Sequence, residues 1–269
     1  MNLVAHYGRL LGSLGRYTLA RELSLRGNFL VKVSVEVIWL GIMIAFYAAV
    51  FAKTKSIAGW SENQYLFFVG SFFALNGLIE TLFLENCNEF AELVRTGDLD
   101  FLLLKPVDEQ FLISCRRVDW AVGTNVLMGG VVMLIALARM HWEFDPVRLL
   151  AFVATFGCGT AIAYSFMLML TATSVWLVRN QSLMEMWWLF SSLARYPKEI
   201  FLGSKAEPLG FIFTFILPIL LVANVPADVM VRTLDPSMVA YTVFATVVLL
   251  VVSRRFFRYA LKSYRSASS

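Results

Sequence analysis

Residues 120–140 read WAVGTNVLMGGVVMLIALARM. The single charged side chain in this stretch is Arg139, the residue before the last one. A helix of about 20 residues is long enough to cross the hydrocarbon core of a bilayer, which is about 30 Å thick. The stretch therefore predicts a transmembrane helix.

The composition of the whole chain extends this prediction. Of its 269 residues, 59% are hydrophobic and 16% are charged, whereas a soluble domain carries about 25% charged residues. A chain of this size cannot bury so much apolar surface in its own interior. We therefore expect an all-α integral membrane protein whose residues 1–269 form a single transmembrane domain.

Six more apolar stretches accompany the first one. They cover about residues 28–51, 65–84, 147–178, 182–194, 209–225 and 238–252. The stretch that starts near residue 182 is interrupted at Arg195 and Pro197, and the next one is broken at Pro218. Counting every piece gives seven candidate crossings.

The distribution of Lys and Arg argues against seven crossings. Residues 1–26, the loop 86–118 and the C-terminal tail are all rich in Arg and Lys, which is typical of cytoplasmic segments. Both termini on one side require an even number of spans. We therefore expect six transmembrane helices, with an external re-entrant hairpin within residues 198–237, between the fifth and the sixth. Irregular backbone at membrane depth is tolerated where protein or a cavity surrounds it.

Residues 1–26 show the periodicity of an amphipathic helix. Leu3, Tyr7, Leu10 and Leu14 recur at helical spacing, and the arginines lie mostly off that stripe. A basic amphipathic helix before the first span favours a position in the headgroup layer. The alternative is a solvated helix that packs on a cytoplasmic loop.

Motifs of catalysis are missing from the sequence. It contains no GxSxG, no HExxH and no Gly-rich phosphate loop followed by Lys and Ser or Thr. The two histidines and three scattered cysteines do not have the spacing of metal ligands. We expect no enzyme activity, catalytic residue, metal or cofactor in this chain. The net charge of +4 is assigned to cytoplasmic loops and not to nucleic-acid binding.

Polar side chains inside spans are candidates for a translocation path or gate, because charge is costly to bury in hydrocarbon. These candidates are Lys32, Glu36, Asn76, Glu80 and, in an aromatic-rich stretch, Trp187. Lys32 and Glu80 are expected at similar depth and could form an ion pair between two antiparallel spans. That structural interpretation and the functional one, a polar path or gate, both remain open. Trp187 could equally belong to an interfacial aromatic belt.

The loop 86–118 is the most distinctive segment. Its part FAELVRTG predicts a short helix that ends at Gly97, because glycine commonly ends helices. The next part, DLDFLLLKPVD at 98–108, places a cluster of apolar residues in a polar loop. Such a cluster indicates a partner surface, unless it packs on the loop's own helix or on the membrane.

The segment RTGDLDFLLLKPVD resembles the signature of a branch of ABC-2-type ABC transporter permeases, the export-type membrane subunits. Three further pieces are similar to that branch and occur in the same order: ARYPKEIF at 194–201, LPILLVANVPA at 217–227 and YRSASS at 264–269. Together the pieces extend over about two thirds of the chain.

The resemblance implies a permease that exports a hydrophobic or amphipathic substrate. It also implies a dimer of identical or related permeases in a prokaryotic inner membrane, with two separate ATPase subunits that bind ATP and Mg²⁺. The loop 86–118 would then be the coupling loop that docks on the ATPase, through Glu89, Glu92, Arg95, Gly97, Asp98, Asp100, Lys105 and Pro106. The external re-entrant segment would include Arg195, Tyr196, Pro197, Pro218 and Pro226.

Two other functions fit a chain of this kind. An ion-gradient-driven secondary transporter would show polar residues in the middle of its spans and internal repeats, and neither is clear in this sequence. A non-transporting membrane scaffold would bind an ATPase without moving any solute. Membrane lipid is an expected partner in every case, and nucleic acid is not.

Overall fold

The computed structural model describes residues 3–177, 181–201 and 207–264, and these residues are almost entirely helical, with no strand among them. The prediction of an all-α membrane protein is confirmed. The C-terminal piece YRSASS, apart from Tyr264, lies outside the described residues.

In chain order the elements are α1 Leu3–Ser24, α2 Arg26–Phe51, α3 Glu62–Ile79, η1 Glu80–Leu84, α4 Glu85–Thr96, α5 Leu99–Leu103, α6 Glu109–Cys115, α7 Trp120–Arg139, α8 Pro146–Thr173, α9 Gln181–Ala194, η2 Lys198–Phe201, α10 Glu207–Phe211, η3 Ile212–Ile216, α11 Ile219–Val231 and α12 Pro236–Ser263.

Five stretches in the described residues are long and apolar enough to cross a membrane. They are α2, the continuous helix Glu62–Thr96, α7, α8 and α12. A sixth is possible if Glu207–Ile216 and Ile219–Val231, which meet at 86°, form one broken span. The same bend is compatible with a re-entrant hairpin. The chain is therefore a multi-pass membrane protein with five to six candidate spans.

The expected fifth span, 182–194, corresponds to α9, which has 14 described residues and so extends about 21 Å at 1.5 Å per residue. That is less than the thickness of the hydrocarbon core, about 30 Å. The helix ends before Arg195 and Pro197, where the sequence indicated an interruption, and the chain continues into the bent segment that follows.

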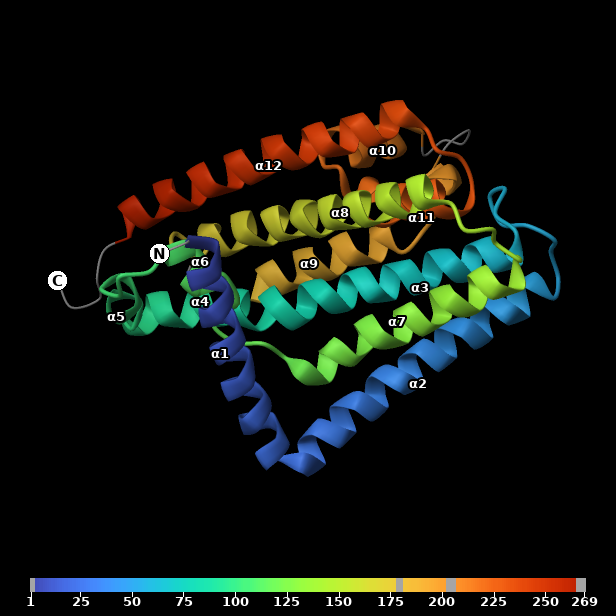
Figure 1. Ribbon diagram of the computed structural model, residues 1–269. Coiled ribbons are helices and arrows are strands. Elements are labelled where there is room, and N and C mark those ends of the chain that lie inside the picture. Colours follow the sequence, from blue (N-terminus) through green and yellow to red (C-terminus); the bar gives the residue numbers. More distant parts are fainter. Residues whose placement is uncertain (1–2, 178–180, 202–206, 265–269) are drawn as a thin grey trace.

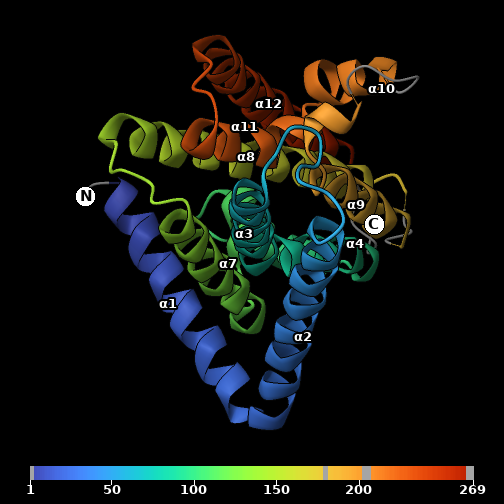
Figure 2. The same ribbon diagram turned by 90° about the vertical axis from the view of Figure 1, so that its right-hand side faces the viewer.

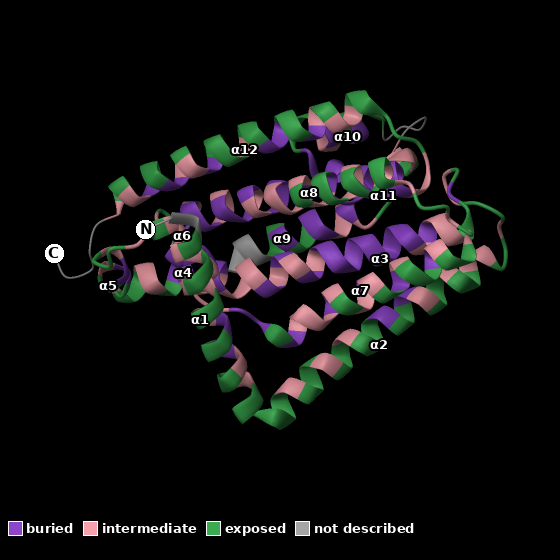
Figure 3. Cartoon of the chain, in the orientation of Figure 1, coloured by how far each residue is buried: buried purple, intermediate pink, exposed green. Residues whose placement is uncertain are grey.

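The helix α3 lies in the middle of the bundle (Figure 2). In the apolar part of the helix that α3 begins, Glu62–Thr96, 72% of the residues are buried, against 11% in that of α2, and Figure 3 shows the same contrast. The helices α3 and α7 approach closely because glycine faces glycine at their contact. A Cβ added to Gly129 would lie 2.5 Å from the carbonyl oxygen of Gly70. Small residues allow such close packing of membrane helices.

The second span does not stop at the membrane boundary that the sequence suggested near residue 84. The π-helical turn η1 joins α3 to α4, so that one helix of 35 residues runs from Glu62 to Thr96. Its length of about 52 Å exceeds the hydrocarbon core. The segment 86–118 is accordingly mostly helical and not an open loop. Gly97 ends α4 with a φ of 81°, which confirms the predicted stop.

Both termini lie at the same end of the bundle (Figure 1). We call this end, which holds α5, α6, the start of α1 and the last turns of α12, the terminal end. The opposite end holds α11, the segment 52–61 and the turn 140–145, and we call it the hairpin end.

The helix α1 is held against the terminal half of the bundle. The indole nitrogen of Trp120 donates to the carbonyl oxygen of Gly15 (3.0 Å), and the backbone N–H groups of Trp120 and Ala121 donate to the Glu22 carboxylate (3.1 and 3.2 Å). A carboxylate at a helix N-terminus is favourable, so Glu22 helps to fix the start of α7. Burial raises the pKa of the Glu22 carboxyl.

Candidate functional site

The apolar cluster of residues 99–104 divides between two environments. Leu99 and Leu102 are buried, with exposed fractions of 0% and 7%. Leu99 packs with Phe90 and Phe257 in a small core at the terminal end. Phe101 and Leu104, in contrast, are 70% and 81% exposed. The short helix α5 is thus anchored by one set of side chains and presents the other set outward.

Ion pairs brace the helices that carry α5. Glu89 on α4 pairs with both Arg116 and Arg117, and Glu85 pairs with Arg117 at 3.3 Å. The side chain of Asn86 accepts from the backbone N–H of Arg117 (2.8 Å) and donates to its carbonyl oxygen (2.7 Å). These contacts fix α4 against the segment that follows α6.

A second brace joins α6 to α12. The Asp108 carboxylate accepts from Arg254 at 2.7 Å, and Arg254 also donates to the side chain of Gln110 at 3.0 Å. Burial alone would raise the pKa of Asp108, but the hydrogen bonds from Arg254 and from the backbone of Phe111 hold that pKa below its usual value. The backbone N–H of Asp108 donates to Tyr7 on α1, so this corner connects three parts of the chain.

The predicted coupling residues are not all on one surface. Glu89 forms ion pairs with Arg116 and Arg117 within the chain. Asp98 accepts from the hydroxyl of Thr96 at 2.8 Å, and Asp100 interacts with Tyr264. The remaining candidates are exposed near α5, except for Gly97, which is half-buried: Glu92, Arg95, Lys105 and Pro106. The sequence did not separate the residues that brace this region from those that face outward, and their role in coupling stays a prediction.

A cavity of about 430 Å³ opens between α2, α3, α7 and α9. Its polar lining residues are Glu36, Asn76, Glu80, Asn125, Ser191 and Arg195. Glu80 accepts from the Asn76 amide at 2.8 Å, and Glu36 accepts from the Asn125 amide at 2.8 Å. The guanidinium of Arg195 lies 5.7 Å from the ring centre of Trp39 and 5.8 Å from that of Phe72.

Three of the five predicted path residues, Glu36, Asn76 and Glu80, line this cavity. The expected ion pair between Lys32 and Glu80 is wrong. Lys32 pairs with Asp119 at 2.9 Å and lines a separate cavity of about 210 Å³ beside α1. The reason is that α2 packs more extensively on α7, whose N-cap is Asp119, than on α3.

Trp187 does not line the cavity. Its side chain is 2% exposed and stacks on Phe190 at 5.5 Å between ring centres. Its neighbour Trp188 lines the cavity instead. The sequence analysis missed Asn125, although a polar residue inside the span 120–140 would have been found by the rule that singled out Asn76. It also placed Arg195 in the external segment, whereas this residue reaches the cavity.

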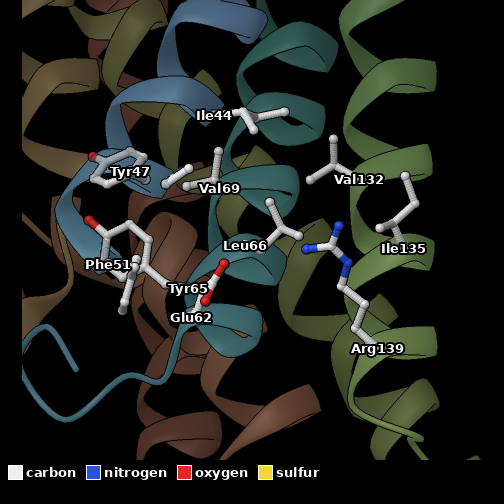
Figure 4. A pocket seen from close by; sticks show the side chains of 11 residues that line it. Ile44, Tyr47, Phe51, Glu62, Tyr65, Leu66, Val69, Val132, Ile135 and Arg139 are labelled. Carbon is white, nitrogen blue, oxygen red and sulfur yellow. The ribbon is translucent and has the colours of Figure 1, made fainter. Parts of the chain in front are cut away.

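A third cavity, of about 280 Å³, lies between α2, α3 and α7, nearer the hairpin end than the cavity of about 430 Å³. Figure 4 shows its lining, in which apolar side chains such as Val69 and Val132 are flanked by Glu62 and Arg139. The tyrosine rings of Tyr47 and Tyr65 form one wall. The two cavities therefore follow the same groove of helices at different depths.

The hairpin end is closed by a network of charges. Arg232 pairs with Glu199 at 2.7 Å and with Asp228 at 3.1 Å, and Lys198 pairs with Asp228 at 2.8 Å. The Arg232 guanidinium lies 4.6 Å from the ring centre of Trp60, whose indole N–H donates to Glu199 at 3.1 Å. This network connects η2 and α11 to the segment that precedes α3.

The other residues predicted for the re-entrant segment are distributed around this network. Asn224 on α11 donates to the carbonyl oxygen of Tyr196 at 3.2 Å and accepts from the backbone N–H of Lys198 at 2.8 Å, which holds the two residues on either side of Pro197. Pro218 is the N-cap of α11, at the bend, and Pro226 lies inside α11. No group of three His, Cys, Asp or Glu side chains that could hold a metal occurs in the described part of the chain.

Comparison with protein families gives one match, to the ABC-2 family transporter proteins, over residues 37–268. Comparison with curated proteins and with solved structures gives no match. The matched range covers α3 to α12 and most of α2, so it includes the braced α5 and most of the cavity lining, while Glu36 lies just before it. The chain therefore belongs to the ABC-2 family of transporter proteins and is a membrane permease component of an ABC transporter.

Proposed function

We propose that this chain is the permease subunit of an ABC exporter and that a separate ATPase docks on the α5 surface at the terminal end. The observation that carries the proposal is the exposure of Phe101 and Leu104 on a helix that buried Leu99 and two ion-pair braces hold in place. Large apolar side chains on a fixed, protruding element are typical of protein docking surfaces.

The surroundings of Phe101 and Leu104 support the same proposal. Glu92, Arg95 and Lys105 are exposed nearby and supply the polar rim that surrounds the apolar centre of most interfaces. The sequence has no phosphate-binding loop of its own. ATP and Mg²⁺ would therefore bind to the partner, and this chain would not be an enzyme.

The proposal places the terminal end in the cytoplasm. Arg254, Arg255, Arg258 and Lys262 lie in the last turns of α12, and such residues favour the cytoplasmic side. Both termini would then face the cytoplasm of a prokaryotic cell, and the hairpin end would face outward. A pair of permeases, identical or related, would be served by two ATPase subunits.

The continuous helix Glu62–Thr96 supplies a mechanical link between the two sites. Its α4 part is braced beside α5, and Glu80 at the start of η1 lines the cavity. A displacement of α5 by the ATPase would be transmitted along this helix, since a helix is stiff over its length. A hydrophobic or amphipathic substrate would then move from the cavity to the outer side.

The proposal is tested by purifying the tagged full chain with its ATPase and measuring both retention and ATP hydrolysis. Phe101→Glu should abolish retention, because it places a charge in an apolar contact. Asp98→Lys and Asp100→Lys test the rim. The matched control is Phe144→Glu, which changes a side chain that is 73% exposed at the hairpin end. Undiminished retention and hydrolysis in the α5 variants would contradict the docking surface.

A further inference from the structure

Two carboxylates in the membrane cavity have no cationic partner. Glu36 and Glu80 both line it, and their side-chain hydrogen bonds from Asn125 and Asn76 come from neutral amides. Among the described residues neither carboxylate forms an ion pair, whereas Lys32 one turn from Glu36 does, with Asp119. Carboxylates inside a membrane protein usually pair or mark a ligand path, because isolated charge is costly there.

Asn125 adds an acceptor that has no donor. This residue is 4% exposed, and its amide oxygen has no hydrogen-bond partner. Its NH₂ group donates to Glu36, and this contact orients the amide, since a carboxylate accepts but does not donate. A buried acceptor without a donor is destabilising. The wall of the cavity around Glu36 is therefore rich in acceptors and poor in donors.

The rest of the cavity is suited to an apolar body. Trp39, Phe72 and Trp188 form its aromatic walls, together with aliphatic side chains such as Ile42. A volume of about 430 Å³ lies within the range that small ligands occupy in proteins, roughly 300–1,000 Å³.

Arg195 is the cationic residue that lines this cavity, and no ion pair joins it to Glu36 or Glu80 among the described residues. It stacks on Phe72, which precedes Glu80 by two helical turns, a separation of about 12 Å along the helix axis. The end that holds Glu80 therefore keeps its negative character. A negatively charged group would be repelled there.

We propose that this cavity binds an amphipathic amine, with the ammonium group at Glu36 and Glu80 and the apolar body against Trp39, Phe72 and Trp188. An ammonium supplies three N–H donors and a positive charge, which suit two carboxylates whose described side-chain hydrogen bonds come from neutral amides. The inference rests on the proposed function, since it assigns the substrate class to the permease.

The test measures equilibrium binding of dodecylamine to the full chain in phosphatidylcholine nanodiscs, with empty nanodiscs subtracted. Dodecanoic acid and dodecanol are the matched probes, because they share the alkyl chain and differ in the headgroup. The double variant Glu36→Gln with Glu80→Gln removes both charges and keeps the side-chain shape. Glu62→Gln is the control, since Glu62 is on α3 but lines the other cavity.

We expect saturable binding of dodecylamine, at least about tenfold tighter than that of either matched probe. The double variant should weaken it by at least about tenfold, and Glu62→Gln should leave it unchanged. Equal binding by the double variant, or equal affinity for the three probes, would overturn the inference. If the double variant does not fold, each single variant should weaken binding, and unchanged affinity in both would overturn it equally. Because no ATPase is present, failure here would leave ATPase docking on α5 intact, and failure of docking would leave this binding intact.

Discussion

The two ends of the bundle use charged side chains differently. At the hairpin end, Arg232 pairs with both Glu199 and Asp228 beside Trp60, which is fully buried. At the terminal end, the pairs of Glu89 and Asp108 hold helices in place, while Phe101 and Leu104 remain exposed. The network at the hairpin end joins parts of the same chain around a buried side chain. The pairs at the terminal end hold helices in place beside a surface that stays exposed, as expected where a partner binds.

The largest expected effect is at the hairpin end. Asp228→Ala removes a buried carboxylate that pairs with both Lys198 and Arg232. We expect the free energy of unfolding to fall by about 3 kcal/mol, because removing one partner leaves buried charges uncompensated. Unfolding in mixed micelles measures the loss, with Glu143→Ala, an exposed position near the same end, as the control. A loss no greater than that of the control would show that the network does not close this end.

The corresponding change at the terminal end should cost less. Arg117→Ala removes the pairs with Glu85 and Glu89, but the Arg117 side chain is 31% exposed and the backbone contacts with Asn86 remain. We expect a loss of about 1 kcal/mol, measured in the same way. A loss equal to that of Asp228→Ala would remove the distinction between the two ends.

Acid should weaken the terminal end through Asp108. The pKa of this carboxyl is lowered in the folded chain. Its stabilising effect is therefore present above the unfolded pKa, about 3.9, and is lost as the pH falls through the folded value. We expect the melting temperature to fall with pH below about 4, and to fall less steeply in Asp108→Asn. Identical acid profiles for the two proteins would contradict the role of the Asp108 pair with Arg254.

The smallest expected effect is on the exposed surface of α4. Glu92 and Arg95 form an ion pair in which the side chains are 58% and 60% exposed. Glu92→Ala should leave the stability nearly unchanged, because exposed pairs contribute little. ATPase retention measured in parallel shows whether this pair belongs to the docking rim. A stability loss as large as that of Arg117→Ala would mean that the pair braces the fold instead.

Much of the fold could be predicted from local signals in the sequence. Apolar stretches of sufficient length predict spans, and the termination of α4 follows from Gly97 because few other residues adopt its backbone conformation. The polar residues Glu36, Asn76 and Glu80 could be predicted as cavity residues because apolar spans rarely contain them.

The partners of these residues could not be predicted in the same way. Depth along a span places Lys32 and Glu80 at one level but does not say which helices are neighbours, and Lys32 meets Asp119 of α7 instead. Arg195 reaches the cavity because its guanidinium lies against Trp39 of α2 and Phe72 of α3. The brace formed by Glu89 also depends on how α4 folds back against the segment after α6. Such tertiary contacts leave no local pattern.

The central claim is that α5, and not the hairpin end, meets the ATPase. A photo-activatable benzoylphenylalanine at position 101, or at position 144 as the matched site, tests it in the assembled complex. Both native residues are phenylalanines that are more than two thirds exposed, at 70% and 73%. The account predicts a crosslink to the ATPase from position 101, also in the presence of ATP, and no crosslink from position 144. A crosslink from position 144, or none from position 101, would contradict it.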